Sequence, residues 1–206
     1  MSEIDPASYV PNLFWNEGWP EEGTDPNPPA YQGTPPGITP GRVPLALTLG
    51  ESDRAIVLLT TVKAYPTGVS MIVSCLLRRA SAETDIGDPI SEGRILLTLE
   101  MPDGHQLGGT DPLPEYEYLA ELRTHPERAR DEAWMPGHPV LRRAGAGGGA
   151  SFEQAYWLWP LPSPGLIRVS CEWPEQGIAA TTHQFDAQLL RDAAAEARPQ
   201  PLLPGR

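Results

Sequence analysis

A series of short apolar segments, each alternating with polar residues and bounded by Gly- or Pro-rich turns, constrains the fold most strongly. Alternation of period two is typical of strands with one buried face. The pattern predicts strands over 43–49, 55–65, 69–77, 94–101, 152–159, 165–173 and 178–185, with Val140-Leu141 as a further short one. Strands and helices do not alternate along the chain. The sequence therefore predicts an all-β, two-sheet, immunoglobulin-like β-sandwich.

The stretch 152–173 contains three of the six tryptophans. We expect its two strands to form an antiparallel hairpin across the Pro-rich corner 160–165. In the expected register one face is apolar and faces the core, with Phe152 opposite Trp173, Tyr156 opposite Val169 and Leu158 opposite Ile167. The other face then carries Trp157 and Trp159, with Trp157 opposite Arg168.

Trp157, Trp159 and Arg168 are therefore the candidate interaction face, because Trp and Arg are favoured at binding hot spots and form cation–π pairs. Three alternatives remain open for this face. The N-terminal arm or the C-terminal helix covers it, a protein partner binds it, or sugar rings stack on it as in carbohydrate-binding sandwiches.

Residues 1–41 form a Pro-rich acidic arm, with nine prolines, six acidic side chains and no sustained periodicity. Such a segment does not build a core of its own. Within it, Phe14, Trp15 and Trp19 lie close together in sequence and are followed by acidic residues. The arm either docks on its own domain or offers a free acidic-aromatic recognition motif.

The remaining chain, 42–198, is expected to be one domain with an irregular insertion at 102–150. Short helices are expected within 115–133, with Thr124 as a cap, and the glycines of 144–150 predict a flexible or left-handed loop. Asp186 is well placed to cap a helix over about 187–197. The tail 199–206 is expected to be disordered.

The formal charge of −12 argues against nucleic acid as a partner, since that affinity depends on many basic side chains. The sequence shows no signal peptide and no long apolar segment, which predicts a cytoplasmic protein without a membrane partner. Cys75 and Cys171 both lie at inward strand positions. In a reducing compartment two buried thiols are favoured over a disulfide, although opposed strands of a sandwich allow the bond.

No pattern in the sequence requires catalysis. The glycine loop lacks the Lys-Ser or Lys-Thr of a phosphate-binding loop, and the four histidines lack zinc-ligand spacing. Asp103 and His105 supply only two ligands beside a turn, so neither a metal nor a cofactor is predicted. Because catalytic residues are assembled in space, an enzyme or small-ligand site within 102–150 stays open as an alternative.

The motifs Trp157-Leu-Trp-Pro-Leu-Pro-Ser-Pro-Gly and Cys171-Glu-Trp-Pro resemble those of an uncharacterised family of high-GC bacterial proteins. The resemblance extends from about Arg42 to the helix after Asp186. It implies one structural unit and brings no activity with it. The function favoured by the sequence is a non-catalytic protein-interaction module, either adaptor or structural, that uses the Trp/Arg face or the arm. Its partner is a protein whose identity the sequence leaves open, and a carbohydrate-binding module is a further alternative.

Overall fold

The computed structural model describes residues 28–78, 87–90, 92, 94–127, 133–147 and 151–200. The described chain is mostly β, and every strand pairing within it is antiparallel. The strands form a six-stranded sheet, a four-stranded sheet and a small two-stranded sheet. The mainly β structure predicted from the alternating pattern is therefore confirmed.

The six-stranded sheet has the order β2-β4-β5-β9-β8, and β3 also pairs with β4. Its strands are β2 (Gly41–Arg42), β3 (Leu47–Glu51), β4 (Ala55–Tyr65), β5 (Gly68–Leu77), β8 (Val140–Gly147) and β9 (Ser151–Trp159). β-branched residues are frequent in β4 and β5, the central strands, as expected for residues that fit a pleated surface covered on one side.

The four-stranded sheet has the order β11-β10-β6-β7. Its strands are β6 (Leu96–Glu100), β7 (Gln106–Gly108), β10 (Leu166–Trp173) and β11 (Ile178–Asp186). A short 3-10 turn, η2 (Pro174–Gln176), joins β10 to β11. The two-stranded sheet pairs β1 (Ile38–Thr39) with β12 (Arg198–Pro199).

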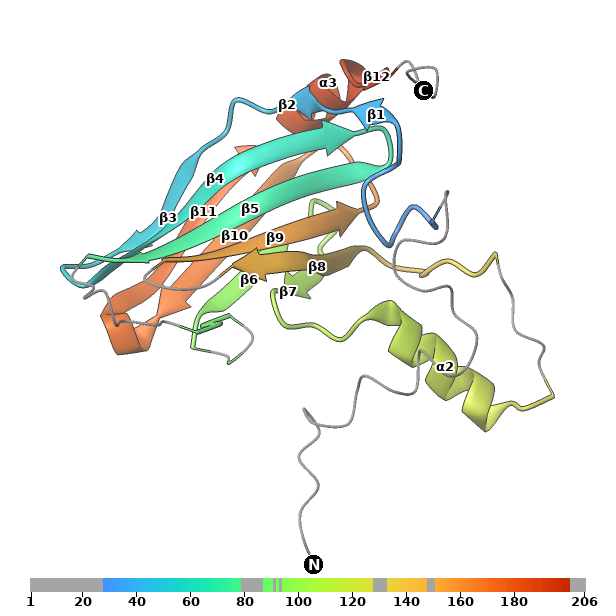
Figure 1. Cartoon of the computed structure of the whole chain (residues 1–206), viewed down its shortest axis with the longest axis horizontal. Helices are drawn as coiled ribbons and strands as arrows, with labels where there is room; N and C mark the ends of the chain where they lie inside the picture. Colours follow the sequence, from blue (N-terminus) through green and yellow to red (C-terminus); the bar gives the residue numbers. More distant parts are fainter. Residues whose placement is uncertain are drawn as a thin grey trace, which may run out of the picture.

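One apolar core joins the two larger sheets. Figure 1 shows the four-stranded sheet behind the six-stranded one, and the inward rows of both contribute to a single cluster of buried side chains. Val73 of β5 is 3% exposed, and Ile167 and Trp173 of β10 are fully buried. The inward positions predicted for Phe152, Tyr156, Leu158, Ile167, Val169 and Trp173 are confirmed.

Two helices accompany the sheets. α3 (Gln188–Ala195) follows β11 with Ala187 at its N-cap position, and the Gln188 N–H donates over 2.8 Å to Oδ1 of Asp186, the predicted cap, one position earlier. α3 packs on β4 and β2 so closely that a Cβ on Gly41 would lie 1.7 Å from the Ala193 carbonyl oxygen. α2 (Pro114–Thr124) lies beyond β8 in Figure 1, and Thr124 ends this helix instead of capping one.

The predicted hairpin of 152–173 is wrong. β9 pairs with β5 and β8, whereas β10 pairs with β6 and β11, so the corner 160–165 carries the chain from one sheet to the other. The two inward rows face each other across the core instead of lying side by side. A hydrogen bond joins this corner to the β4–β5 turn. The Leu161 N–H donates to the Thr67 carbonyl over 3.0 Å, an ordinary length for an amide hydrogen bond.

Three further boundaries differ from the prediction. Strand pairing after Val43 begins only at Leu47. The segment 144–147, expected as a flexible glycine loop, continues β8 beside β9, and residues 148–150 lie outside the described residues. Pro199, expected at the start of a disordered tail, pairs with Ile38 instead; residues 201–206 are outside the described part.

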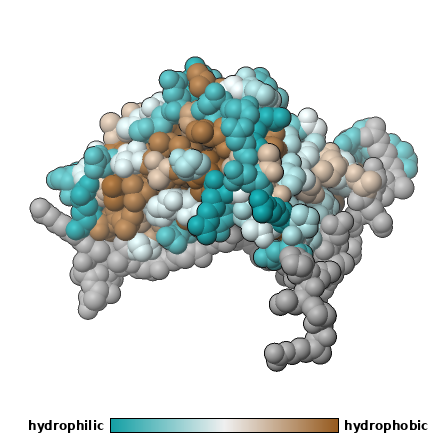
Figure 2. Space-filling model, turned by 90° about the horizontal axis from the view of Figure 1, so that it is seen from above, coloured by the Kyte–Doolittle hydropathy of each residue, from teal (hydrophilic) through white to brown (hydrophobic). Residues whose placement is uncertain are grey.

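An apolar region lies on the surface away from the sheet faces. Figure 2 shows apolar residues gathered on the side seen from above, where β3 and α3 lie, among hydrophilic ones. Leu189 of α3 is 38% exposed, and Leu45 and Leu47 are only partly buried against the core. In the described part of the chain, no helix has the length and apolar character needed to cross a membrane.

Candidate functional site

Trp157 lies on the outer face of β9, as its position in the alternation predicted, but it is only 1% exposed. Tyr65 packs edge-on against its ring at 5.6 Å between centroids. Its indole N–H donates to the Ala30 carbonyl over 2.9 Å, which satisfies a polar group that burial would otherwise leave unpaired. Trp157 is thus covered by the chain's own residue 30, one of the alternatives that the sequence left open.

Gly68 makes room for this ring. A Cβ on Gly68 would lie 2.6 Å from Trp157 Cζ2 and 2.5 Å from the Leu158 carbonyl oxygen. Neither contact is sterically possible without a shift of the chain. A residue larger than glycine at the start of β5 would therefore displace the indole or the strand.

Tyr31 continues the cover and links two further tryptophans. It is 1% exposed, and its ring meets Trp159 at 6.3 Å and Trp134 at 5.6 Å, both edge-on. Trp134 in turn stacks on Tyr118 of α2 at 4.6 Å with 15° between the ring planes. Offset and edge-on contacts of this kind add to the free energy gained from burial alone.

These contacts create an aromatic platform, which we define as Tyr31, Trp134, Met135 and Trp159. The platform is built from three separate segments: the arm, the loop before β8 and the end of β9. Trp134 and Trp159 are half-buried, and Met135 is 41% exposed. The platform is thus fixed by its buried partners and still accessible at its surface.

Arg168 does not belong to this surface. It lies in β10 of the other sheet and pairs with Glu100, with 2.5 Å between Nη1 and Oε1 and 47% of its side chain exposed. The predicted cation–π pair with Trp157 is therefore wrong, because a core separates the two side chains. Phe14, Trp15 and Trp19, the other predicted contact residues, lie outside the described residues.

A buried ion pair holds α2 against β8, beside the platform. Arg142 Nη1 lies 2.5 Å from Glu115 Oε1, and the two side chains are 20% and 6% exposed. Arg142 is also the cross-strand neighbour of Trp157. Sequence analysis missed this pair, since nothing in the spacing of residues 115 and 142 indicates that they meet.

Several titratable groups described within the insertion 102–150 form separate pairs. His138 Nε2 lies 3.2 Å from Glu117 Oε2, and His138 Nδ1 lies against the Pro139 carbonyl. The pKa of His138 is raised, mainly by the Pro139 carbonyl and to a smaller extent by Glu117. Asp103 and His105 contact each other at 3.1 Å, whereas Asp111 binds the Gly108 N–H. Within the described residues, no three His, Cys, Asp or Glu side chains gather as a metal site would require.

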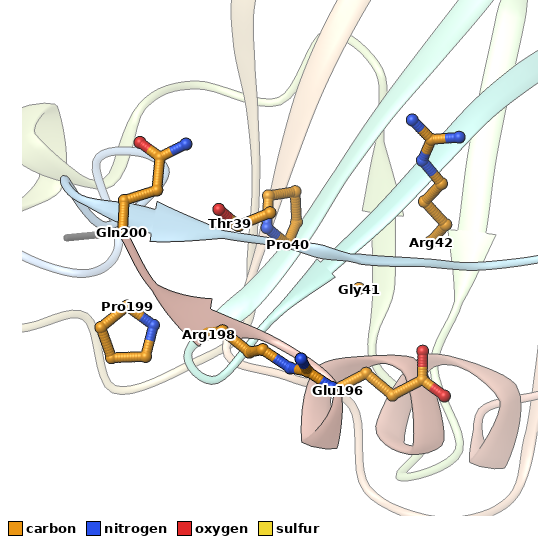
Figure 3. Close-up of a pocket in the computed structure, with 8 residues that line it drawn as sticks. All are labelled: Thr39, Pro40, Gly41, Arg42, Glu196, Arg198, Pro199 and Gln200. Atoms are coloured by element: carbon orange, nitrogen blue, oxygen red, sulfur yellow. The ribbon is translucent and has the colours of Figure 1, made fainter.

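The hollow drawn in Figure 3 lies elsewhere, between the two-stranded sheet, β2 and the end of α3. It has a volume of about 520 Å³, opens widely to solvent and is lined by Thr39, Pro40, Gly41, Arg42, Glu196, Arg198, Pro199 and Gln200. Arg42 and Gln200 lie at opposite ends of it. Its charged side chains are exposed, and the lining contains no histidine or cysteine.

Cys75 and Cys171 are both free and buried in the core. Burial raises the pKa of each thiol to about 12, and for Cys75 the nearby Cys171 adds to the effect. Thiolates, not thiols, are the reactive form. These cysteines are therefore suited to packing rather than to catalysis.

We expect the native thiols to resist a disulfide reagent such as dithionitrobenzoate at pH 8, because the fraction ionised and the access are both very small. After denaturation without reductant, two thiols should react rapidly. Absorbance at the released thiophenolate band measures both rates. Rapid reaction of the folded protein would contradict the burial, and the absence of reactive thiols after denaturation would reveal a disulfide.

No known protein family, curated protein or solved structure matches this chain. The resemblance to a family of high-GC bacterial proteins therefore stays a prediction, and the function has to be inferred from the chain itself.

Proposed function

We propose that the protein is a non-catalytic interaction module, a β-sandwich of the immunoglobulin-like kind, whose aromatic platform binds a protein partner. The observation that carries this proposal is the state of Trp134 and Trp159. Both rings are held by Tyr31, itself buried, yet both keep part of their surface open beside the exposed Met135. Interface cores are enriched in Trp, Tyr and Met, and rigid anchors bind without a large loss of side-chain entropy.

The chemistry around the platform favours binding over catalysis. Arg142, the cross-strand neighbour of Trp157, and Glu115 neutralise each other and tie α2 to the sheet. Asp103 pairs with His105, and Glu117 with His138, at exposed positions. A catalytic site would be expected to gather several titratable groups in one pocket. The alternative of an enzyme within 102–150 finds no such gathering among the described residues.

The test compares two variants of the full chain. Trp159→Ala removes the half-buried anchor, whereas Leu166→Ala removes an apolar side chain that is 50% exposed on the other sheet. Trp157→Ala is unsuitable, because that ring is part of the packing. Wild type and both variants would first be shown to have the same circular dichroism spectrum.

Proteins captured from the native cell by wild type and by Leu166→Ala, but not by Trp159→Ala, would then be purified and titrated by calorimetry. We expect Trp159→Ala to weaken the affinity for the purified partner by about tenfold or more, as the loss of an anchoring tryptophan does. Capture that is the same for all three proteins, or a purified partner whose affinity is unchanged by Trp159→Ala, would refute the proposal.

A further inference from the structure

The outer face of the six-stranded sheet carries an apolar patch that the aromatic platform does not use. We call Ile56, Leu58, Ile72, Leu76 and Ala155 the aliphatic patch. Cross-strand register puts Ile56 opposite Leu76, and Ile72 opposite Ala155, on the same face as Trp157. All five side chains are only partly buried, although each is apolar.

Figure 1 views this sheet face-on, and neither described helix crosses β4, β5 or β9 there. Polar residues lie within the patch as well: the Ser74 hydroxyl donates to Glu153 Oε1 over 3.2 Å, and Thr60 Oγ1 lies 3.2 Å from the Ser74 hydroxyl. Partly exposed aliphatic residues on neighbouring strands of one face are typical of a surface that receives another segment. The question is which segment binds there.

The chain itself already covers the next row of the same face. Ala30 accepts the Trp157 indole N–H, and Trp157 follows Ala155 of the patch by two residues in β9. A step of two residues along a strand is about 7 Å. The described arm therefore arrives at the edge of the aliphatic patch.

The arm residues before Pro28 have the length and composition to continue across it. Pro28 follows Trp19 by nine positions, which allows a reach of about 30 Å. The patch extends only about 20 Å from the row of Trp157 to the row of Ile56 and Leu76. The arm also supplies apolar side chains that could cover the patch, namely Leu13, Phe14 and Trp15.

Charge favours the same pairing. Lys63 and Arg42 are direct cross-strand neighbours, both exposed, in the row of Trp157. Neither forms an ion pair with another described residue. The arm brings Glu21, Glu22 and Asp25 between its aromatic cluster and this row. In a chain of net charge −12, two such exposed neighbouring cations select an acidic segment.

We propose that residues 13–19 of the arm bind the aliphatic patch of their own chain, with the acidic residues 21–25 beside Lys63 and Arg42. The arm is then a strap across the outer face of the six-stranded sheet, and residues 28–31 are its fixed end. This binding is intramolecular, so it goes beyond the proposed binding of a partner at the aromatic platform.

The test places a photo-cross-linker in the full chain. Phe14 is replaced by p-benzoylphenylalanine, a larger aromatic residue, and the irradiated protein is digested and mapped by mass spectrometry. We expect cross-links within one chain to the peptides that contain Ile72 or Ala155. Cross-links only between two chains, or only to the four-stranded sheet, would overturn the proposal.

Matched variants test the contact itself. Ile72→Glu places a charge in the patch, and Thr98→Glu places the same charge on the outer face of the other sheet. A tenfold change in the docking equilibrium reduces a bound fraction of about nine-tenths to about one-half. We therefore expect the cross-link yield to fall by nearly half for Ile72→Glu and to stay unchanged for Thr98→Glu.

Two further variants complete the test. Ile72→Thr, which keeps a β-branched residue, replaces Ile72→Glu if the latter does not fold, and should also lower the yield. Lys63→Glu should lower it through repulsion of the acidic residues. Equal yields in the folded patch variants and Thr98→Glu would overturn the proposal. Because no partner is present, such a failure would leave the proposed function of the aromatic platform untouched.

Discussion

Ile167→Asp is expected to abolish folding. Ile167 is fully buried in β10, opposite Phe185 of β11, in the core that both large sheets share. An aspartate there has no partner and must be buried charged or take up a proton. Either state costs about 3–5 kcal/mol or more beyond the lost apolar contacts. A domain of this size is stable by only about 5–15 kcal/mol, so we expect an unfolded or aggregated protein.

The matched control is Ser170→Asp in the same strand. Ser170 lies on the outer face between Thr98 and Thr182, and its hydroxyl contacts Thr182 Oγ1 at 3.0 Å. A carboxylate there stays in water beside two hydroxyl groups, so the cost should be below about 1 kcal/mol. Circular dichroism during thermal unfolding compares the two. A cooperative transition of Ile167→Asp near that of wild type would disprove the assignment of the core face.

The inward face was predictable because burial leaves a period of two in the sequence. That period determined the inward positions of β9 and β10 correctly, from Phe152 to Trp173. It does not distinguish two strands that pair in one sheet from two strands that face each other across the core. Both arrangements bury the same row of side chains. The pairing of β9 with β10 was therefore wrong although the buried residues of both strands were right.

The candidate site was predicted only in part for a related reason. Trp157 and Trp159 were recognised from their outward positions, but an outward position on a strand says nothing about what covers it. The cover comes from Ala30 and Tyr31, more than 120 residues away in sequence. Trp134 could have been suspected, because a tryptophan within a polar insertion needs a packing partner, yet its contact with Tyr31 has no sequence pattern.

Two further errors reflect local conformations that tertiary contacts decide. Gly145 and Gly147 permit left-handed backbone and so predicted a loop, but hydrogen bonding along β9 draws this segment into β8. Thr124 has a side chain suited to a helix start. Its hydroxyl instead donates a hydrogen bond to the Ala120 carbonyl over 3.0 Å at the end of α2.

Arg142→Met should destabilise the protein by about 3–5 kcal/mol, because it leaves the Glu115 carboxylate buried without its cation. The Glu115 side chain is 6% exposed, and among the described residues its Oε2 atom has no hydrogen-bond partner. Arg142 therefore provides the compensation for this charge. The same change should loosen α2 from β8, since the pair joins these two elements. Urea unfolding gives the free energy of unfolding.

The protein contains its own control for this prediction. Arg168 and Glu100 form a pair with the same atoms at the same 2.5 Å, but their side chains are 47% and 37% exposed. Arg168→Met should cost less than about 1 kcal/mol, as exposed ion pairs usually do. Equal losses for Arg142→Met and Arg168→Met would show that burial does not decide the strength of these two pairs.

The double variant Arg142→Met, Glu115→Leu separates the cost of an orphaned charge from the value of the pair. Replacing both members of a buried ion pair with apolar groups is often close to neutral, whereas removing one is not. We expect the double variant to recover most of the stability that Arg142→Met loses. If instead it stays as unstable as Arg142→Met, the lost stability reflects the attraction within the pair and not the cost of an orphaned charge. The position of α2, and with it Tyr118 beneath Trp134, would then depend on this bond.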